Sequence, residues 1–290
     1  MILKSIIRHY MPHSAIRAVR RVYYWPGDFL DGALKKRPEL TPPRAMSRYV
    51  GEGDFKSVGE TYAKWIIEFA GLTGKDRILD VGCGIGRMAV PLIPYLGAEG
   101  IYEGFDVVAE GIEWCGKNIT RKHPNFRFRV ADIYNKQYNP RGKVASSEYR
   151  FPYEDAYFDV VFLGSVFTHM RLADTAHYVH EISRVLKNGG RCFATFFILN
   201  AESLASIKSG RSALDFQHPL DACLTIDKRT PERAIGYHEG AVREMFGKER
   251  LAVIEPVRFG SWSGRDGCLG YQDIVIAKKT DTSDLLAFVP

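Results

Sequence analysis

The chain has 290 residues, of which 46% are hydrophobic and 26% are charged, and its formal net charge is +6. Its apolar runs all fall short of the ~20 residues of a membrane-spanning helix, so the composition indicates a soluble protein with one large core. The five cysteines are widely spaced and form no C-x-x-C pair, so we expect reduced thiols in a cytoplasmic protein.

The positive charge is concentrated at the start of the chain. Residues 1–53 contain ten Lys and Arg residues but four Asp and Glu residues, which accounts for the whole excess of six. The main body is therefore formally neutral, so the basic pI of the whole chain says nothing about a nucleic-acid groove in that body. We treat residues 1–53 as a basic N-terminal extension.

The extension has two basic and apolar segments separated by Pro12. In the second, Ile16, Val19 and Tyr23 recur near helical spacing among arginines. A basic amphipathic helix can lie on an anionic membrane surface, so residues 1–24 are a candidate peripheral contact with the inner face of a membrane. The alternative is an arm that packs its apolar side on the body of the protein.

Residues 54–290 are expected to form one domain in which strands and helices alternate. The first helix begins at a capping box, Ser57 to Glu60. The predicted strands are 77–81, 101–107, 126–131, 158–164 and 191–199, and the helices between them are 86–96, 109–123 and 172–186. A long loop is predicted at 134–155, an irregular insert that caps the substrate at 200–236, a helix at 238–246, and an antiparallel hairpin at 251–259 and 271–278. This alternation predicts parallel strands with helices on both faces.

A glycine turn follows the first predicted strand. Asp80 precedes Gly82, Gly84 and Gly86 in the pattern Asp-x-Gly-x-Gly-x-Gly. A dinucleotide fingerprint is G-x-G-x-x-G, so the third glycine comes one residue early, and no P-loop Lys follows. A carboxylate here repels a pyrophosphate and suits a ligand with an ammonium group.

Two further acids end the next two predicted strands. Asp106 at the tip of the second strand can accept from both hydroxyls of a ribose. Asp132 at the tip of the third can accept from an adenine amino group. Because the carboxyl ends of parallel strands share one edge of a sheet, we expect Asp80, Asp106 and Asp132 to face one crevice.

This pattern resembles the class I S-adenosylmethionine-dependent methyltransferases over roughly residues 55–200. Phe158 to Phe162 resembles the fourth strand of that family, and Glu181 to Arg191 its helix and turn before strand five. The resemblance implies an α/β fold with a doubly wound, mostly parallel seven-stranded sheet whose last strand is antiparallel. It implies S-adenosylmethionine as cofactor, S-adenosylhomocysteine as product, and cofactor contacts from Asp80, Val81, Gly82, Cys83, Gly84, Gly86, Arg87, Asp106, Val107, Ala131, Asp132, Ile133, Gly164 and Ser165.

Transfer of a methyl group to an oxygen needs alignment and a base that takes the hydroxyl proton. His169, which follows the fourth strand, is the first candidate for this base, and His238 is the second. Either histidine could instead order its own loop. His177 and His180 are spaced by three on a helix without a third ligand, so no metal is expected.

Three segments resemble bacterial methyltransferases associated with cell-surface polysaccharide genes: Ser165 to Met170, Thr195 to Phe197, and Tyr271 to Asp273. That resemblance implies a hydroxyl of a sugar, glycan or lipid-linked glycan as the acceptor. Loop residues would either contact the acceptor or pack the loops: Tyr134, Tyr138, Tyr149, Phe151, Phe216, His218, Tyr237, Trp262 and Arg265.

Other acceptors and a different function stay open. A small metabolite, a protein or RNA is the alternative acceptor. No Asn-Pro-Pro-Tyr signature follows the fourth strand, which argues against DNA as a substrate. A protein that binds S-adenosylmethionine without catalysis is the third hypothesis.

Overall fold

The computed structural model describes residues 13–34, 37–47, 53–136 and 138–281. The chain divides into two units, one formed by residues 1–65 and 82–145 and the other by residues 66–81 and 146–290. Within the described ranges, no helix is long and apolar enough to cross a membrane.

The first unit contains a parallel pair of strands, in which Asp106 lies opposite Val130. Tyr102 and Phe126 lie opposite each other and are buried, and Phe105, which points to the other face of β2, is buried too. The elements of this unit in chain order are α2 (His13–Ala33), α3 (Arg44–Ser47), the start of α4 (Phe55–Phe69), α5 (Ala89–Leu92), β2 (Ile101–Asp106), α6 (Ala109–Cys115) and β3 (Phe126–Val130).

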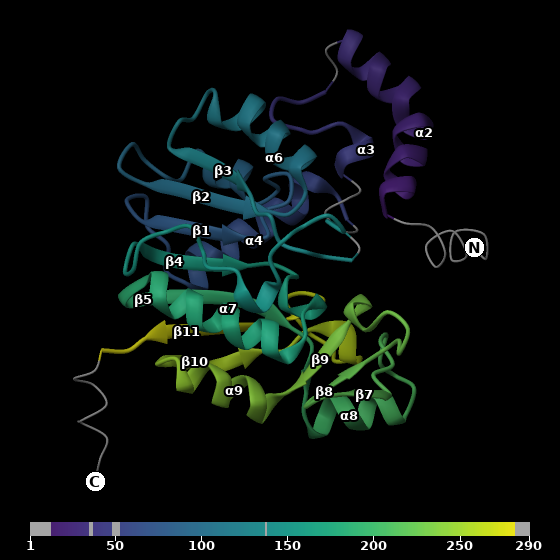
Figure 1. The fold of residues 1–290 in the computed structure, drawn as a ribbon, viewed down its shortest axis with the longest axis vertical. Helices are drawn as coiled ribbons and strands as arrows, with labels where there is room; N and C mark the ends of the chain where they lie inside the picture. The colour runs from purple at the N-terminus through teal and green to yellow at the C-terminus, as the bar shows by residue number, and fades with distance from the viewer. Residues whose placement is uncertain (1–12, 35–36, 48–52, 137, 282–290) are drawn as a thin grey trace. The chain divides into compact units, whose positions relative to one another are not determined.

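The second unit contributes five strands to the larger of the two sheets, and its two longest described helices are α7 and α9. Two parallel pairings join β1 to β4 and β4 to β5, and β11 runs antiparallel to both β5 and β10. In Figure 1, α7 and α9 lie beside β5 and β10. The elements are β1 (Arg77–Val81), β4 (Phe158–Leu163), α7 (Leu172–Val185), β5 (Leu186–Phe196), α9 (Glu239–Lys248), β10 (Leu251–Arg258) and β11 (Asp273–Lys279).

The seven strands form one sheet in the order β10-β11-β5-β4-β1-β2-β3 (Figure 1). β1 pairs with β4, β2 with β3 and β4 with β5 in parallel, whereas β11 runs antiparallel to β5. Nearly every residue of β1, β4 and the second half of β5 is buried, which explains their continuous apolar sequences. The predicted fold class is therefore confirmed.

The insert at 200–236 is not irregular, contrary to the prediction. It contains α8 (Ala201–Lys208), β7 (His218–Leu220) and β8 (Cys223–Thr225), which combine with β6 (Ile198–Leu199) and β9 (Ile235–His238) in a second sheet of order β6-β9-β8-β7. Its strands are too short for a clear period-two pattern. They are stabilised by a separate apolar cluster made of Phe197, Leu199, Phe216, Ala234 and Trp262. We call residues 198–238 the insert lobe.

Two predicted helices also differ from the structure. The helix expected at 86–96 is reduced to the four residues of α5, because turns precede it and Pro94 follows it. The helix expected at 109–123 changes after α6 into a π-helical turn, Gly116–Thr120.

The first helix, α4, begins two residues before its predicted cap. The Asp54 carboxylate accepts from the backbone N–H groups of Lys56 (3.1 Å) and Ser57 (2.9 Å), so Asp54 caps the helix in place of Ser57.

Candidate functional site

The glycine turn of the first unit is held in an unusual backbone conformation. Gly82, Gly84 and Gly86 have φ angles of 77°, 57° and 72°, a region that residues with a side chain rarely adopt. The N–H groups of Gly82 and Cys83 both donate to the Phe105 carbonyl of β2, at 2.9 and 3.1 Å. The turn is thus tied to β2 by backbone bonds, and it presents bare backbone where side chains would otherwise stand.

Asp106, at the end of β2, lies directly against this turn. Its Oδ2 accepts from the Gly84 N–H at 2.9 Å, and its Oδ1 accepts from the Val108 N–H at 2.8 Å. Burial raises the pKa of Asp106, whereas the N–H donors oppose that rise. A carboxylate has about four acceptor positions, so this half-buried group keeps capacity for a further donor.

The segment after β3 alternates between buried and exposed residues. Ala131 and Ile133 are buried, whereas Asp132 between them is exposed. The Ala131 N–H donates to the Asp106 carbonyl at 2.9 Å, which places this segment beside the end of β2. The Asp132 side chain is therefore accessible from solvent, which it must be if it is to bind a ligand.

Arg87, a predicted cofactor contact, is directed toward α4. Its side chain is buried, and it interacts electrostatically with Tyr62 and Asp54 of that helix and its cap. Burial lowers the pKa of Arg87. A Cβ at Gly59 would lie 2.3 Å from the Arg87 carbonyl oxygen, so α4 packs directly on the backbone here. Cys83 and Val81, two other predicted contacts, are buried as well.

In the second unit, Asp80 is buried near the end of β1, opposite Phe162 of β4. Gly164 and Ser165 follow the end of β4. Ser165 has a φ of 62°, so a residue with a side chain adopts the left-handed region. Its N–H donates to Thr195 Oγ1 of β5 at 2.7 Å, which helps to hold this strained turn.

Gln272, just before β11, joins the tip of β4 and was missed by the sequence analysis as a site residue. Its Nε2 donates to Ser165 Oγ at 2.8 Å. Its Oε1 is buried, and none of the described residues donates to it. If the carboxamide is turned over, Nε2 takes the unpaired place instead, so either orientation leaves one polar atom unused. The sequence signal for Gln272 was its place in the segment Tyr271 to Asp273, which resembles methyltransferases associated with cell-surface polysaccharide genes.

His169, the first candidate base, is fixed by a carbonyl of the insert lobe. It ends the 3-10 turn η3 (Phe167–His169), and its Nδ1 lies 2.8 Å from the carbonyl oxygen of Glu232. A carbonyl can only accept, so Nδ1 carries the proton and Nε2 is left as the acceptor. Burial lowers the pKa of His169, which keeps the ring neutral near pH 7. This is the tautomer that a general base needs.

Tyr237 of β9 forms hydrogen bonds to the backbone at both ends of η3. Its buried hydroxyl donates to the carbonyls of Phe167, at 3.0 Å, and Met170, while Thr175 Oγ1 lies 2.8 Å from it. Burial raises the pKa of Tyr237, so the hydroxyl stays protonated. His238, the second candidate base, follows in sequence at the exposed start of α9.

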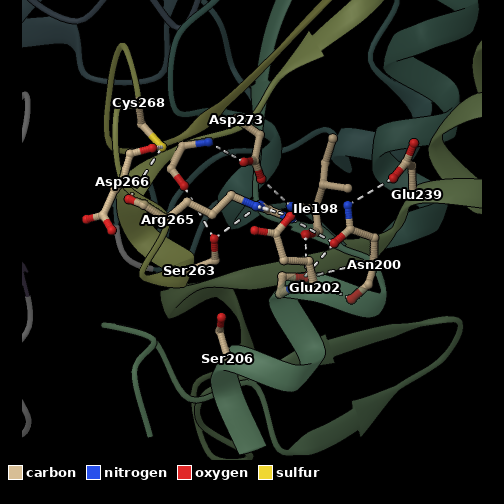
Figure 2. A network of polar contacts seen from close by, with 12 residues as sticks. Ile198, Asn200, Glu202, Ser206, Glu239, Ser263, Arg265, Asp266, Cys268 and Asp273 are labelled. Atoms are coloured by element: carbon tan, nitrogen blue, oxygen red, sulfur yellow. Dashed lines mark hydrogen bonds and ion pairs between the residues drawn. The ribbon is translucent and has the colours of Figure 1, made fainter. Parts of the chain in front are cut away.

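The link between β10 and β11 is tied to the insert lobe by two buried charged residues (Figure 2). Asp273 accepts from the N–H group of Ile198 at 2.5 Å (Figure 2). It also accepts from the N–H group of Gly260 (2.6 Å) and from Trp262 Nε1 (2.8 Å). Arg265 bonds Asn200 Oδ1 at 2.8 Å and pairs with Glu202 at 2.9 Å.

This packing removes several loop residues from the list of acceptor contacts. Four large aromatic side chains predicted either to touch an acceptor or to pack are buried and therefore pack: Phe151, Phe216, Tyr237 and Trp262. Tyr134, another aromatic residue predicted either to contact the acceptor or to pack, is exposed. Within the described ranges, no group of three or more His, Cys, Asp and Glu side chains is arranged to hold a metal ion.

Comparison with known proteins identifies the central segment. Residues 79–194 match a family described as "Methyltransferase domain". The match covers less than half of the chain. It includes the glycine turn, Asp106, Asp132, the tip of β4 and His169.

Two curated relatives are similar to part of this chain. A 27-O-demethylrifamycin SV methyltransferase from Amycolatopsis mediterranei is 31% identical over 131 residues, which are 44% of this chain and 41% of the relative. A probable cobalt-precorrin-6B C(15)-methyltransferase from Thermoplasma acidophilum is 28% identical over 116 residues, 39% of this chain and 50% of the relative. The chain spans about half the length of the curated relatives it matches.

A solved structure agrees with the fold. The PH0226 protein from Pyrococcus horikoshii superposes with a TM-score of 0.53 at 14% identity, covering 80% of this chain and 93% of that one. At this identity the likeness concerns the fold alone.

Proposed function

We propose that the chain is an enzyme that transfers a methyl group from S-adenosylmethionine to an acceptor. The observation that carries the proposal is the Asp106 carboxylate bonded to the N–H of Gly84 in a turn of three positive-φ glycines. A carboxylate that is positioned by backbone donors and keeps acceptor capacity fits the two hydroxyls of a ribose. The match to a methyltransferase domain supports the same reading.

The residues near Asp106 fit a sulfonium nucleoside better than a dinucleotide. The acids at the strand tips would repel a pyrophosphate, and the early third glycine departs from the dinucleotide fingerprint. When bound, S-adenosylmethionine supplies a methyl group on a positively charged sulfur, which leaves as a neutral thioether. Asp106 would hold the ribose, and Asp132 the adenine. The other contacts named from the sequence stay predictions: Asp80, Val81, Gly82, Cys83, Gly84, Gly86, Arg87, Val107, Ala131, Ile133, Gly164 and Ser165.

Binding of the product tests the cofactor. We expect Asp106→Asn to weaken S-adenosylhomocysteine binding by about 1–3 kcal/mol, roughly 5- to 150-fold, because hydrogen bonds to a charged acceptor are lost. Isothermal titration calorimetry measures this affinity, and thermal unfolding shows that the variant is folded. Asp215→Asn, at an exposed position in the insert lobe, is the matched control. Equal affinity in both variants would contradict the ribose assignment.

For the acceptor, we propose a hydroxyl of a sugar, a glycan or a lipid-linked glycan. The Amycolatopsis relative is named for an O-methylation and the Thermoplasma relative for a C-methylation, so relatives leave the acceptor atom open. A neutral His169 whose Nδ1 carries the proton supports a hydroxyl, because an oxygen nucleophile must lose its proton as it attacks and the other ring nitrogen can take it. The unused polar atom of the Gln272 carboxamide would bind a second hydroxyl of such an acceptor.

The role of His169 has a kinetic test. Once a labelled-methyl screen of sugars, lipid-linked glycans, small metabolites and RNA has found an acceptor, we expect His169→Gln to lower kcat about 10²- to 10⁴-fold. Affinity for S-adenosylhomocysteine should not change. His238→Gln is the matched control and should keep its activity. A His169→Gln variant as active as the control would overturn the base assignment.

The same proposal fixes the sign of the pH dependence. The base acts only when neutral, and burial lowers the pKa of His169 below the usual histidine value. The rate of the wild-type enzyme should therefore hold constant through neutral pH and decline on the acid side, as pH falls through the lowered pKa. If the rate declined instead as pH rose above neutral, His169 would be acting in its charged form.

A lipid-linked acceptor would place the enzyme at the inner face of a membrane, with residues 1–24 as the peripheral contact. Residues 1–12 lie outside the described residues. The basic excess of the extension supports this location. If the screen finds methyl transfer to RNA alone, the extension would serve an acidic partner instead. If no acceptor class is methylated although S-adenosylhomocysteine binds, the chain is a binding protein without catalysis.

A further inference from the structure

Helix α2 exposes its apolar side. The large apolar side chains that are more than half exposed are concentrated on this helix and the residue after it: Val19, Val22, Tyr23, Trp25, Phe29, Leu30 and Leu34. At about 100° per residue, those within the helix span an arc of roughly 160°. Two of the rings, Trp25 and Phe29, stack on each other with centroids 5.5 Å apart. We call these seven residues the outer face of α2.

The opposite side of α2 is bound to the chain's own α3. The Asp28 carboxylate accepts from the N–H groups of Arg44 (2.8 Å) and Ala45 (3.2 Å), the first two residues of α3. Arg37 Nη2 donates to the Asp28 carbonyl at 2.9 Å, and Arg44 pairs with Asp31 at 2.7 Å. These bonds fix the rotation of α2 about its axis relative to α3. The outer face cannot be turned toward α3 without breaking them.

An exposed apolar face of this size needs a covering partner, because soluble proteins rarely present such a patch to water. The charge of the extension selects among partners. Residues 1–53 carry the whole net charge of +6, so a second copy of this face would bring like charges together. An anionic lipid surface attracts the same charge, and aromatic side chains such as Tyr23, Trp25 and Phe29 favour the headgroup boundary.

We propose that α2 lies in the plane of an anionic membrane surface with its outer face in the boundary between headgroups and acyl chains. The contact is then Val19 to Leu34, which extends beyond the residues 1–24 expected from the sequence. The bonds from Asp28 and Asp31 orient the helix before it meets lipid, so little ordering remains to be done on binding. The proposal rests on the proposed function in one respect: an enzyme that methylates a lipid-linked acceptor would act at a membrane.

Co-sedimentation with phosphatidylglycerol vesicles and with phosphatidylcholine vesicles tests the surface. The variant is Val22→Glu with Phe29→Glu, two exposed positions whose change should leave the fold intact. Its matched control is Ile254→Glu with Leu269→Glu, which adds the same charge at exposed apolar positions outside the extension. We expect the full-length protein and the control to bind phosphatidylglycerol vesicles. The variant should bind them at least tenfold more weakly, because two apolar side chains that would be buried in the lipid are replaced by charged ones.

Three results would overturn the proposal. The first is equal vesicle binding by variant and control. The second is binding to phosphatidylcholine as strong as to phosphatidylglycerol, which would leave the basic charge without a role. The third is a lipid-free dimer in analytical ultracentrifugation that the variant alone dissociates, which would place a second copy on the outer face. Calorimetry with S-adenosylhomocysteine in the absence of lipid keeps the two proposals separate, since loss of that binding would sink the methyl-transfer proposal and leave the vesicle result standing.

Discussion

At the end of β1 the chain turns through three glycines with positive φ, and backbone bonds to the next strand hold the turn. At the end of β4 it turns through a single serine with positive φ, and side chains from distant parts of the sequence hold it. The first turn requires glycines, which have no side chain. The second turn is held by the side chains of Thr195 and Gln272. Under the proposed function, the glycine turn belongs to the donor side, which would hold the cofactor, and the turn after β4 belongs to the acceptor side. We infer that substitutions on the donor side act mainly through backbone strain, whereas substitutions on the acceptor side act through the side chains that support its turn.

The strongest way to break this comparison is Gly86→Ala. Gly86 has a φ of 72°, and a Cβ there would lie 2.7 Å from Ile119 Cδ1 and 3.1 Å from Cys115 Sγ. We expect a loss of about 1–3 kcal/mol in the free energy of unfolding and at least tenfold weaker binding of S-adenosylhomocysteine. Urea unfolding and calorimetry measure the two effects. Gly247→Ala, in a helix with open space around its Cβ, is the control; it should leave binding unchanged and should not lower the free energy of unfolding.

Tyr237→Phe tests the acceptor side and should have a smaller effect. Loss of the hydroxyl leaves the Phe167 and Met170 carbonyls and Thr175 without their partner, which costs about 1–3 kcal/mol of stability. Methyl transfer should fall because η3 carries His169, while affinity for S-adenosylhomocysteine stays within about twofold. Tyr271→Phe, at an exposed position, is the control. A loss of cofactor affinity equal to the loss of activity would show that the two sides are not separable.

The smallest expected effect compares Ser165→Gly with Ser165→Ala. Both variants lose the hydroxyl that accepts from Gln272, but only alanine keeps the strain of a positive φ. We therefore expect the glycine variant to be more stable than the alanine variant by about 0.5–1 kcal/mol in urea unfolding. The reverse order would mean that the turn is not strained.

The sequence predicted the strands and the glycine turn because their signals are local. The burial of β1 and β4 produces continuous apolar runs, and the turn needs glycines at fixed spacing. The short strands of the insert lobe were missed, since three-residue strands carry no readable period and their stability comes from the cluster around Trp262. Capping by Asp54 was missed because Asp54 and Ser57 are both residues that can cap a helix, and the sequence does not show which of them does so.

The acceptor side was predicted only in part. His169 could be named from its place after a strand, but the carbonyl that sets its tautomer comes from Glu232, 63 residues later. The bond from Gln272 to Ser165 spans 107 residues. Contacts of this range follow from tertiary packing, which leaves no local pattern in the sequence. For the same reason, Trp262 and Phe216 could not be assigned to packing before the lobe was seen.

The Asp273 carboxylate also sets an order of assembly. It accepts from the backbone of Ile198, 75 residues earlier, and so fastens the insert lobe to the link before β11. During translation, all four strands of the lobe are synthesised before Asp273, the residue that bonds the lobe to this link. Contacts of such long range form late, because the loop must be closed before they contribute. During synthesis the acceptor side would therefore be completed after the glycine turn and Asp106, since the bond from Gly84 to Asp106 joins residues only 22 apart.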